Sequence, residues 1–212
     1  MSQRGGAARN SYTFQITLLG VTPPVWRLVS VPGSLSLDQL HQVIQLAMGW
    51  KRTHPYRFDI AGRNYAEPSD GAAPEAVDPR SVSLDQLSLG QGSSLTYIYD
   101  FADDWIHHLT VQGVAPFTPT LTAPALLGGA GACPPEASGG PGGYATLLSA
   151  MRAPDTLAGK QARERLGKLT DPAAWEPASA AEQLPRVIPV GDPLAVPTRS
   201  GRRSKKHRRG GR

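Results

Sequence analysis

Apolar and polar residues alternate strictly near the start of the chain, with the two-residue period of a half-buried β-strand. One side of the segment 12–19 carries its large apolar residues, which are Tyr12, Phe14, Ile16 and Leu18. After a turn that contains Gly20, Pro23 and Pro24, the segment 25–31 is rich in β-branched residues. The pattern predicts two strands that pair as an antiparallel hairpin.

The period changes to that of a helix beyond Pro32 and Gly33. Ser36 and Gln39 have the spacing of a capping box. Apolar residues then recur at helical spacing, at Leu37, Leu40, Val43, Ile44, Ala47 and Met48. We therefore predict an amphipathic helix over 37–49.

Two smaller features belong to this part of the pattern. His41 lies beside the apolar stripe of the helix, where a core-edge histidine bonded to the backbone is favoured over a ligand. Residues 83–87 repeat residues 36–40 letter for letter, as Ser-Leu-Asp-Gln-Leu. We interpret the repeat as the same N-cap chemistry used twice, the second time to begin a single helical turn. An internal duplication is the alternative.

Further strands are predicted from shorter apolar runs. They cover residues 54–60, 94–101 and 105–114, with a short return strand that begins at Tyr65. Residues 102–104 have the composition of a tight turn, whose carboxylates suit the amides of the turn itself. Glycine and proline make up fourteen of the residues 113–143. We therefore expect that segment to be irregular.

Strands come first in this order and helices last, which is typical of the α+β class. We predict a mostly antiparallel sheet of about five strands, one helix inserted after the first hairpin, and a C-terminal helical segment over 144–151 and 158–169. We expect a disordered leader at 1–10, one α+β domain over 11–176 and a disordered basic tail over 177–212.

The net charge of +5 hides an uneven distribution. Residues 199–212 hold eight Lys or Arg and no acid, whereas residues 1–198 hold 14 basic against 17 acidic residues, a net charge of −3. A dense basic run neutralises phosphates without reading sequence. We expect the tail to bind nucleic acid non-specifically, through Arg202, Arg203, Lys205, Lys206, Arg208 and Arg209. A solvated tail without a specific partner is the alternative.

Three features of the sequence bear on the cellular location of the protein, namely membrane spans, signal peptides and cysteine content. No apolar run approaches the ~20 residues of a membrane span, and no apolar segment of a signal peptide follows Arg4 and Arg9. The single cysteine, Cys133, has no partner for an internal disulfide. We expect a cytoplasmic protein that does not bind membranes.

The densest chemistry lies in residues 97–108. We take as a candidate polar site the carboxylates, indole and imidazole of Asp100, Asp103, Asp104, Trp105 and His107. Carboxylate and imidazole suit zinc, manganese or iron. However, neighbours on a strand point to opposite faces, so His107 and His108 do not share one site. The favoured interpretation is structural and without a cofactor, and a bound divalent metal is the alternative.

Two features of the loops also allow a functional and a structural interpretation. A nucleophilic role for Cys133 requires a nearby base, and we favour a partly buried thiol that holds its loop beside Glu136. The glycine-rich run 139–143 precedes a helix and resembles an anion nest. It lacks the residues of a phosphate-binding loop, so flexibility is the favoured interpretation.

Arg27 is a candidate salt-bridge partner for the acidic turn.

Several ordered motifs resemble the plasmid pRiA4b ORF-3-like family, also labelled insertion-element TnpR-like. The strongest lie in the candidate site and the loop after it, and the full set is Tyr12-x-Phe14-x-Ile16-x-Leu18, Pro24-Val25-Trp26-Arg27, Leu37-x-x-Leu40-His41-x-x-Ile44-Gln45-x-x-Met48-Gly49-Trp50, Phe58-x-Ile60-x-Gly62-x-x-Tyr65, Tyr99-Asp100-Phe101-x-Asp103-Asp104-Trp105-x-His107, Cys133-Pro134-Pro135-Glu136 and Gly139-Gly140-x-x-Gly143-Tyr144.

The resemblance implies a compact α+β domain of plasmids, mobile elements and bacterial chromosomes, without an established biochemical function. Ala102 stands where relatives usually carry glycine. Ala137 and Ser138 stand where an acidic residue and a cysteine are common, which weakens a metal or redox role for the loop around Cys133. We therefore expect a non-catalytic binding or accessory protein of plasmid or mobile-element type. A metal-dependent enzyme that uses the hairpin 100–108 is the first alternative, and a purely structural interaction module is the second.

Overall fold

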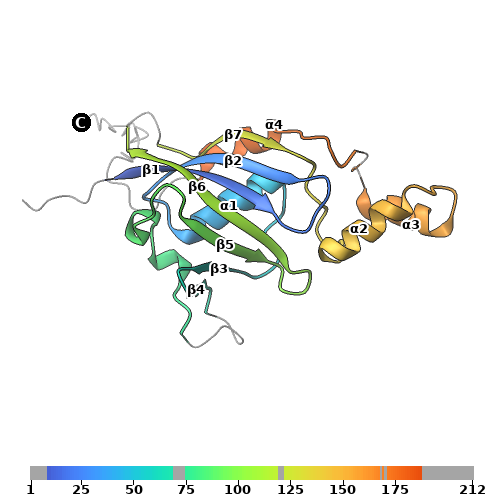
Figure 1. Ribbon diagram of the computed structural model, residues 1–212, viewed down its shortest axis with the longest axis horizontal. Coiled ribbons are helices and arrows are strands. Elements are labelled where there is room, and N and C mark those ends of the chain that lie inside the picture. Colours follow the sequence, from blue (N-terminus) through green and yellow to red (C-terminus); the bar gives the residue numbers. More distant parts are fainter. Residues whose placement is uncertain (1–8, 69–74, 119–121, 168, 170, 188–212) are drawn as a thin grey trace, which may run out of the picture.

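The computed structural model describes residues 9–68, 75–118, 122–167, 169 and 171–187. Its centre is a seven-stranded antiparallel sheet with the spatial order β4-β3-β5-β6-β1-β2-β7 (Figure 1). The strands are β1 (Asn10–Leu18), β2 (Val25–Pro32), β3 (Tyr56–Ile60), β4 (Arg63–Ala66), β5 (Ser94–Tyr99), β6 (Trp105–Pro116) and β7 (Ala125–Ala130). The α+β class and the antiparallel sheet are confirmed, but the described sheet has seven strands instead of about five.

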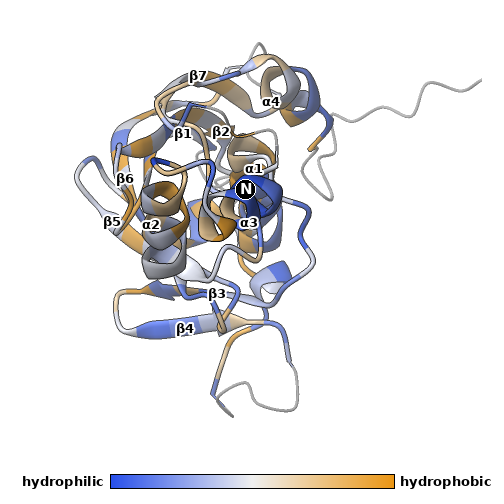
Figure 2. Ribbon diagram, turned by 90° about the vertical axis from the view of Figure 1, so that its right-hand side faces the viewer, coloured by the Kyte–Doolittle hydropathy of each residue, from blue (hydrophilic) through white to orange (hydrophobic). Residues whose placement is uncertain are grey.

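Four α-helices and three short 3₁₀ turns accompany the described sheet. They are α1 (Leu37–Met48), α2 (Gly140–Ala150), α3 (Leu157–Leu166), α4 (Ala178–Gln183), η1 (Pro79–Ser81), η2 (Leu84–Leu87) and η3 (Leu184–Arg186). The helices α1 and α4 lie on the same face of the sheet, and α4 contacts both α1 and β7. The pair α2 and α3 lies beyond the end of the sheet where β5 turns into β6 (Figures 1 and 2).

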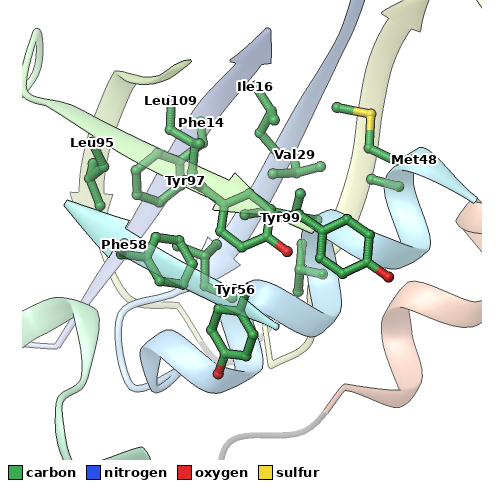
Figure 3. Close-up of a cluster of buried hydrophobic side chains, with 14 of the residues drawn as sticks. Phe14, Ile16, Val29, Met48, Tyr56, Phe58, Leu95, Tyr97, Tyr99 and Leu109 are labelled. Atoms are coloured by element: carbon green, nitrogen blue, oxygen red, sulfur yellow. The ribbon is translucent and has the colours of Figure 1, made fainter. Parts of the chain in front are cut away.

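The first hairpin forms as the alternation predicts. β1 pairs with β2 in a regular antiparallel register, and its other side pairs with β6. The apolar side chains of β1 are buried, with Phe14 and Ile16 fully inaccessible. The core continues across β3 and β5, where Figure 3 shows Tyr56, Phe58 and Tyr97 gathered with residues of β1 and β2.

Helix α1 begins at the predicted capping box. The Ser36 hydroxyl accepts a hydrogen bond from the Gln39 amide at 3.2 Å, and the Gln39 side chain accepts one from the Ser36 amide at 3.0 Å. The helix ends at Gly49, which adopts the left-handed conformation with φ of 83°.

The repeated Ser-Leu-Asp-Gln-Leu segment uses the same chemistry. The Gln86 side chain accepts from the Ser83 amide at 2.7 Å, as η2 begins. The two capped turns are also joined to each other, because Leu37 donates to the Val82 carbonyl and Leu84 donates to the Leu35 carbonyl, both at 3.0 Å. Capping chemistry in both copies is therefore confirmed.

The expectation of an irregular segment over 113–143 was wrong in three places. β6 continues to Pro116, β7 adds an edge strand to the sheet, and α2 begins at Gly140 instead of Tyr144. β7 pairs with β2 around Trp26 and Ala130, although it has no alternating pattern. Its glycines allow this approach, because a Cβ atom at Gly129 would lie 2.8 Å from the Trp175 ring and 2.9 Å from the Trp26 carbonyl oxygen.

The expectation of disorder from residue 177 onward was wrong for the described residues 178–187. These form α4 and η3, and Leu184 is fully buried. Buried residues recur there at helical spacing, at Ala180, Leu184 and Val187, which is a pattern the sequence already carried. The predicted leader 1–10 lies outside the described residues up to residue 8, but it was wrong at its end, because β1 already begins at Asn10. The basic residues 199–212 lie outside the described residues. In the described part of the chain, every helix is too short or too polar to cross a membrane.

Candidate functional site

The turn between β5 and β6 is held by its first carboxylate. Asp100 has a φ of 56°, and its amide donates to the Pro55 carbonyl at 2.9 Å. Its carboxylate accepts from the Ala102 amide at 3.2 Å and lies 3.5 Å from Nδ1 of His54. The predicted bonding of turn carboxylates to turn amides is confirmed at this residue, which is nearly buried.

The second carboxylate joins the turn to the glycine-rich segment. Oδ2 of Asp103 accepts a hydrogen bond from the Gly139 amide at 3.0 Å, at the N-terminus of α2. Gly140 has a φ of 66°, and a Cβ atom there would overlap the Asp103 carbonyl oxygen. The glycines therefore allow two backbones to meet. An anion does lie at this helix N-terminus, but it is a carboxylate of the chain itself.

The histidine and the tryptophan of the hairpin face the interior. His107 is fully buried between Tyr97 and Trp50, whose ring centroids lie 5.2 Å and 5.3 Å from that of the imidazole. Nδ1 of His107 lies 3.1 Å from the Trp105 carbonyl oxygen, whereas Nε2 makes no hydrogen bond. Burial lowers the pKa of His107 to about 3, so the ring is neutral at pH 7.

The hairpin does not assemble its polar residues into one site. His108 is exposed on the face opposite to His107, as the alternation predicts, and Asp104 is exposed as well. Among the residues the structure describes, no three His, Cys, Asp or Glu side chains are arranged to hold a metal ion. Asp100 and Asp103 serve the turn, and Trp105 and His107 serve the core.

The loop with Cys133 is bonded to the segment that follows α1. The Trp50 indole donates to the Pro134 carbonyl at 2.7 Å. Glu136 accepts from the Tyr99 hydroxyl at 2.7 Å and from the Lys51 amide at 3.2 Å. Glu136 therefore positions the loop against the sheet.

Cys133 is a partly buried residue, and its thiol carries no charge at pH 7. Burial of the sulfur raises its pKa well above the ordinary value, although the nearby Arg27 charge acts in the opposite direction. A thiolate is therefore not available at pH 7, and the described hydrogen bonds place no base on the sulfur.

His41 is part of a buried polar group instead of a ligand set. Nδ1 of His41 lies 2.7 Å from the Tyr97 hydroxyl, which also accepts from the Gln45 side chain at 3.0 Å. The imidazole stacks on Tyr56 with ring centroids 3.7 Å apart. Burial lowers the pKa of His41 to about 4. Its core position was predicted, but its partner is a side chain and not the backbone.

Arg27 is the functional candidate that sequence reasoning placed wrongly. It does not pair with the acidic turn. It is 3% exposed, and it donates to the carbonyls of Ala47 at 2.8 Å, Trp26 at 2.8 Å and Ala130 at 2.9 Å. The signal was its position in β2, where the period of two places Arg27 on the buried side with Val25 and Val29.

Arg27 lies in the wall of a cleft of about 450 Å³. Besides Arg27 of β2, three parts of the chain line this cleft, which are the C-terminal end of α1, the loop after β7, and residues of 169 and 171–183. The guanidinium carbon of Arg27 lies 5.7 Å from the ring centroid of Trp175, a cation–π distance. The lining includes several residues of the motifs found in the sequence, namely Arg27, Met48, Gly49, Trp50 and Cys133.

Comparison with known proteins places these motifs in a wider context. The family model described as plasmid pRiA4b ORF-3-like protein matches residues 10–179. The uncharacterized protein y4hQ of Sinorhizobium fredii is 38% identical over 141 residues, which cover 66% of this chain and 72% of the relative. The crystal structure of MM3350, a protein of unknown function from Methanosarcina mazei Go1, has a TM-score of 0.72 at 24% identity, covering 81% of this chain and 97% of the other.

Proposed function

The chain belongs to the plasmid pRiA4b ORF-3-like protein family, and from that premise we propose that it is a non-catalytic binding or accessory protein. Its proposed partner is nucleic acid, contacted without sequence preference through the basic residues near the C-terminus. The relatives described above are uncharacterized, so the proposal rests on this chain's own residues.

The observation that carries the proposal is the separation of charge along the chain. The eight Lys or Arg of residues 199–212 stand without a single acidic neighbour, while residues 1–198 have a net charge of −3. Phosphate backbones attract such a run and repel the acidic remainder. Contact is therefore expected to be limited to the basic segment, with no base-specific component.

The roles of the hairpin side chains support a binding protein over an enzyme. Asp100 and Asp103 are engaged by His54 and by the Gly139 amide, and His107 is buried and neutral. A metal-dependent mechanism would require these groups to leave their partners and converge. Elemental analysis of wild-type protein beside His107→Ala tests that alternative, since an equivalent of metal that only the wild type holds would favour the enzyme.

The proposal is tested by removing the basic segment. Fluorescence anisotropy would compare the full chain with a chain that ends at residue 198, on labelled duplexes of two unrelated sequences. We expect the full chain to bind both duplexes alike and the shortened chain to bind neither. Far-UV circular dichroism of both proteins serves as the control for folding. Equal binding by the shortened chain would contradict the proposal.

A further inference from the structure

Arg27 is a buried cation with no carboxylate partner among the described residues, and we propose that it marks a binding site for a small organic carboxylate. Nε and Nη1 of the guanidinium donate to three backbone carbonyls, whereas Nη2 makes no hydrogen bond to any described residue. Burying a charge without an opposite charge is costly. Electrostatic attraction to this uncompensated charge stabilises an anion that binds in the adjacent cleft.

The protein itself offsets the charge of Arg27 only in part. The Ala47 carbonyl belongs to the C-terminal end of α1, where the helix dipole contributes about half a negative charge. The neighbouring Cys133 contributes none, because its thiol is protonated at pH 7. The guanidinium therefore keeps its positive charge at the base of the cleft, whereas the two carboxylates of the lining, Asp171 and Glu176, are exposed.

A second recess of about 640 Å³ shows the contrast. It also contains two arginines, but both are paired with carboxylates. Nε of Arg80 lies 3.0 Å from Asp78, and Nη2 of Arg186 lies 3.3 Å from Glu182. Of these two cavities, the cleft at Arg27 is therefore the one whose arginine forms no ion pair with a described carboxylate.

The shape of the cleft defines the rest of the ligand. Its volume of about 450 Å³ falls within the range of small-molecule sites. Trp50 and Trp175 supply aromatic surface, and Met48 and Leu169 supply aliphatic surface, so an apolar or aromatic body suits the space beside the charged group. Trp175 comes from the C-terminal segment, which therefore completes the site.

The charges around the cleft favour a carboxylate over a phosphate. Of the guanidinium nitrogens, only Nη2 makes no hydrogen bond to a described residue, so Arg27 offers one nitrogen to a ligand, whereas phosphate sites commonly supply several cationic or backbone donors. Asp171 and Glu176 also line the cleft, and both are exposed carboxylates. Their repulsion acts more strongly on a dianion than on a monoanion. The inferred ligand is a monoanion with an apolar body.

Benzoate is the probe for this site, with benzamide as its neutral isostere. Tryptophan fluorescence of the full chain would be titrated with each compound, and a second titration would use inorganic phosphate. We expect benzoate to bind with a Kd on the order of 1 mM, as fits a fragment of its size. Benzamide should bind at least about tenfold more weakly, because it lacks the charge.

Variants tie the binding to the cleft. Arg27→Gln should abolish benzoate binding, but it also leaves three backbone carbonyls without their donor. Trp175→Ala, at the partly exposed wall, keeps those hydrogen bonds and should weaken benzoate binding at least about threefold. Glu176→Gln should tighten binding, because it removes a like charge. Arg186→Gln, in the other recess, is the matched control and should change nothing. The inference would be overturned by equal binding of benzoate and benzamide, by no benzoate binding, by unchanged binding in Trp175→Ala, or by phosphate binding more tightly than benzoate.

Discussion

The carbonyl oxygen of Asp103 approaches the backbone of Gly140 so closely that a Cβ atom on residue 140 would overlap it, although 37 positions separate the two residues in the chain. This contact fixes the β5–β6 turn against the start of α2, and the hydrogen bond from the Gly139 amide to Asp103 reinforces it. A side chain at Gly140 would therefore push the hairpin and the helix apart.

Gly140→Ala should destabilise the protein by about 1–3 kcal/mol, because it combines this overlap with a left-handed φ of 66°. Gly142→Ala is the matched control in the same helix, since a Cβ atom there meets nothing within 4 Å. We expect that variant to be neutral or slightly more stable. Urea unfolding followed by circular dichroism measures both. Equal stability of the two variants would show that the contact does not hold the turn.

The C-terminal segment is predicted to be part of the folded domain. Leu184→Ala should lower the free energy of unfolding by about 2–5 kcal/mol, because Leu184 is fully buried. Leu157→Ala is the control, since that side chain is 73% exposed and its removal should cost less than about 0.5 kcal/mol. Denaturant titration of both variants gives the comparison. A Leu184→Ala protein as stable as the wild type would mean that this segment does not pack as described.

Stability is predicted to fall as the pH drops below about 6.5. The folded pKa of His107 is about 3 and that of His41 about 4, both depressed by burial from 6.5. Between these folded pKa values and pH 6.5, the unfolded chain therefore binds more protons than the folded chain. The stability that depends on the neutral rings is complete above pH 6.5 and is lost as the pH falls through the folded pKa values. At pH 5 the loss amounts to about 2 kcal/mol for each histidine.

A pair of variants isolates the contribution of His107 to this pH dependence. His107→Gln should flatten the decline in stability between pH 8 and pH 5, whatever it does to stability at pH 8. His108→Gln, at the exposed neighbouring position, should leave the slope unchanged. Denaturant midpoints measured across this range provide the test, and a slope that His107→Gln leaves intact would argue against a neutral buried ring.

Local patterns predicted the elements whose partners are close in sequence. The alternation of β1 and β2, the capping box at Ser36 and the hydrogen bond from the Ala102 amide to the Asp100 carboxylate each involve residues that are close in sequence. The sheet was therefore assigned to the right class, although β4 was predicted only as a short return strand and β7 was not predicted.

The remaining features depend on contacts between distant segments. β7 has no alternation of its own and is a strand because β2 supplies its hydrogen bonds. Because Arg27 is charged, a salt bridge to the acidic turn was predicted for it. Instead, its guanidinium donates hydrogen bonds to backbone carbonyls at the end of α1 and in β7. Ala180 and Leu184 do have helical spacing, but this short pattern precedes a basic segment, and the whole region was predicted to be disordered.

The central claim of nucleic-acid contact through the basic segment is tested most directly by the salt dependence of binding. The full chain would be titrated onto duplex DNA at several salt concentrations, beside a variant with glutamine at Arg202, Arg203, Lys205, Lys206, Arg208 and Arg209. Six phosphate contacts predict a slope of log K against log salt of about −5, which the variant should lose. A slope near zero in the full chain, or the same slope in the variant, would contradict the account.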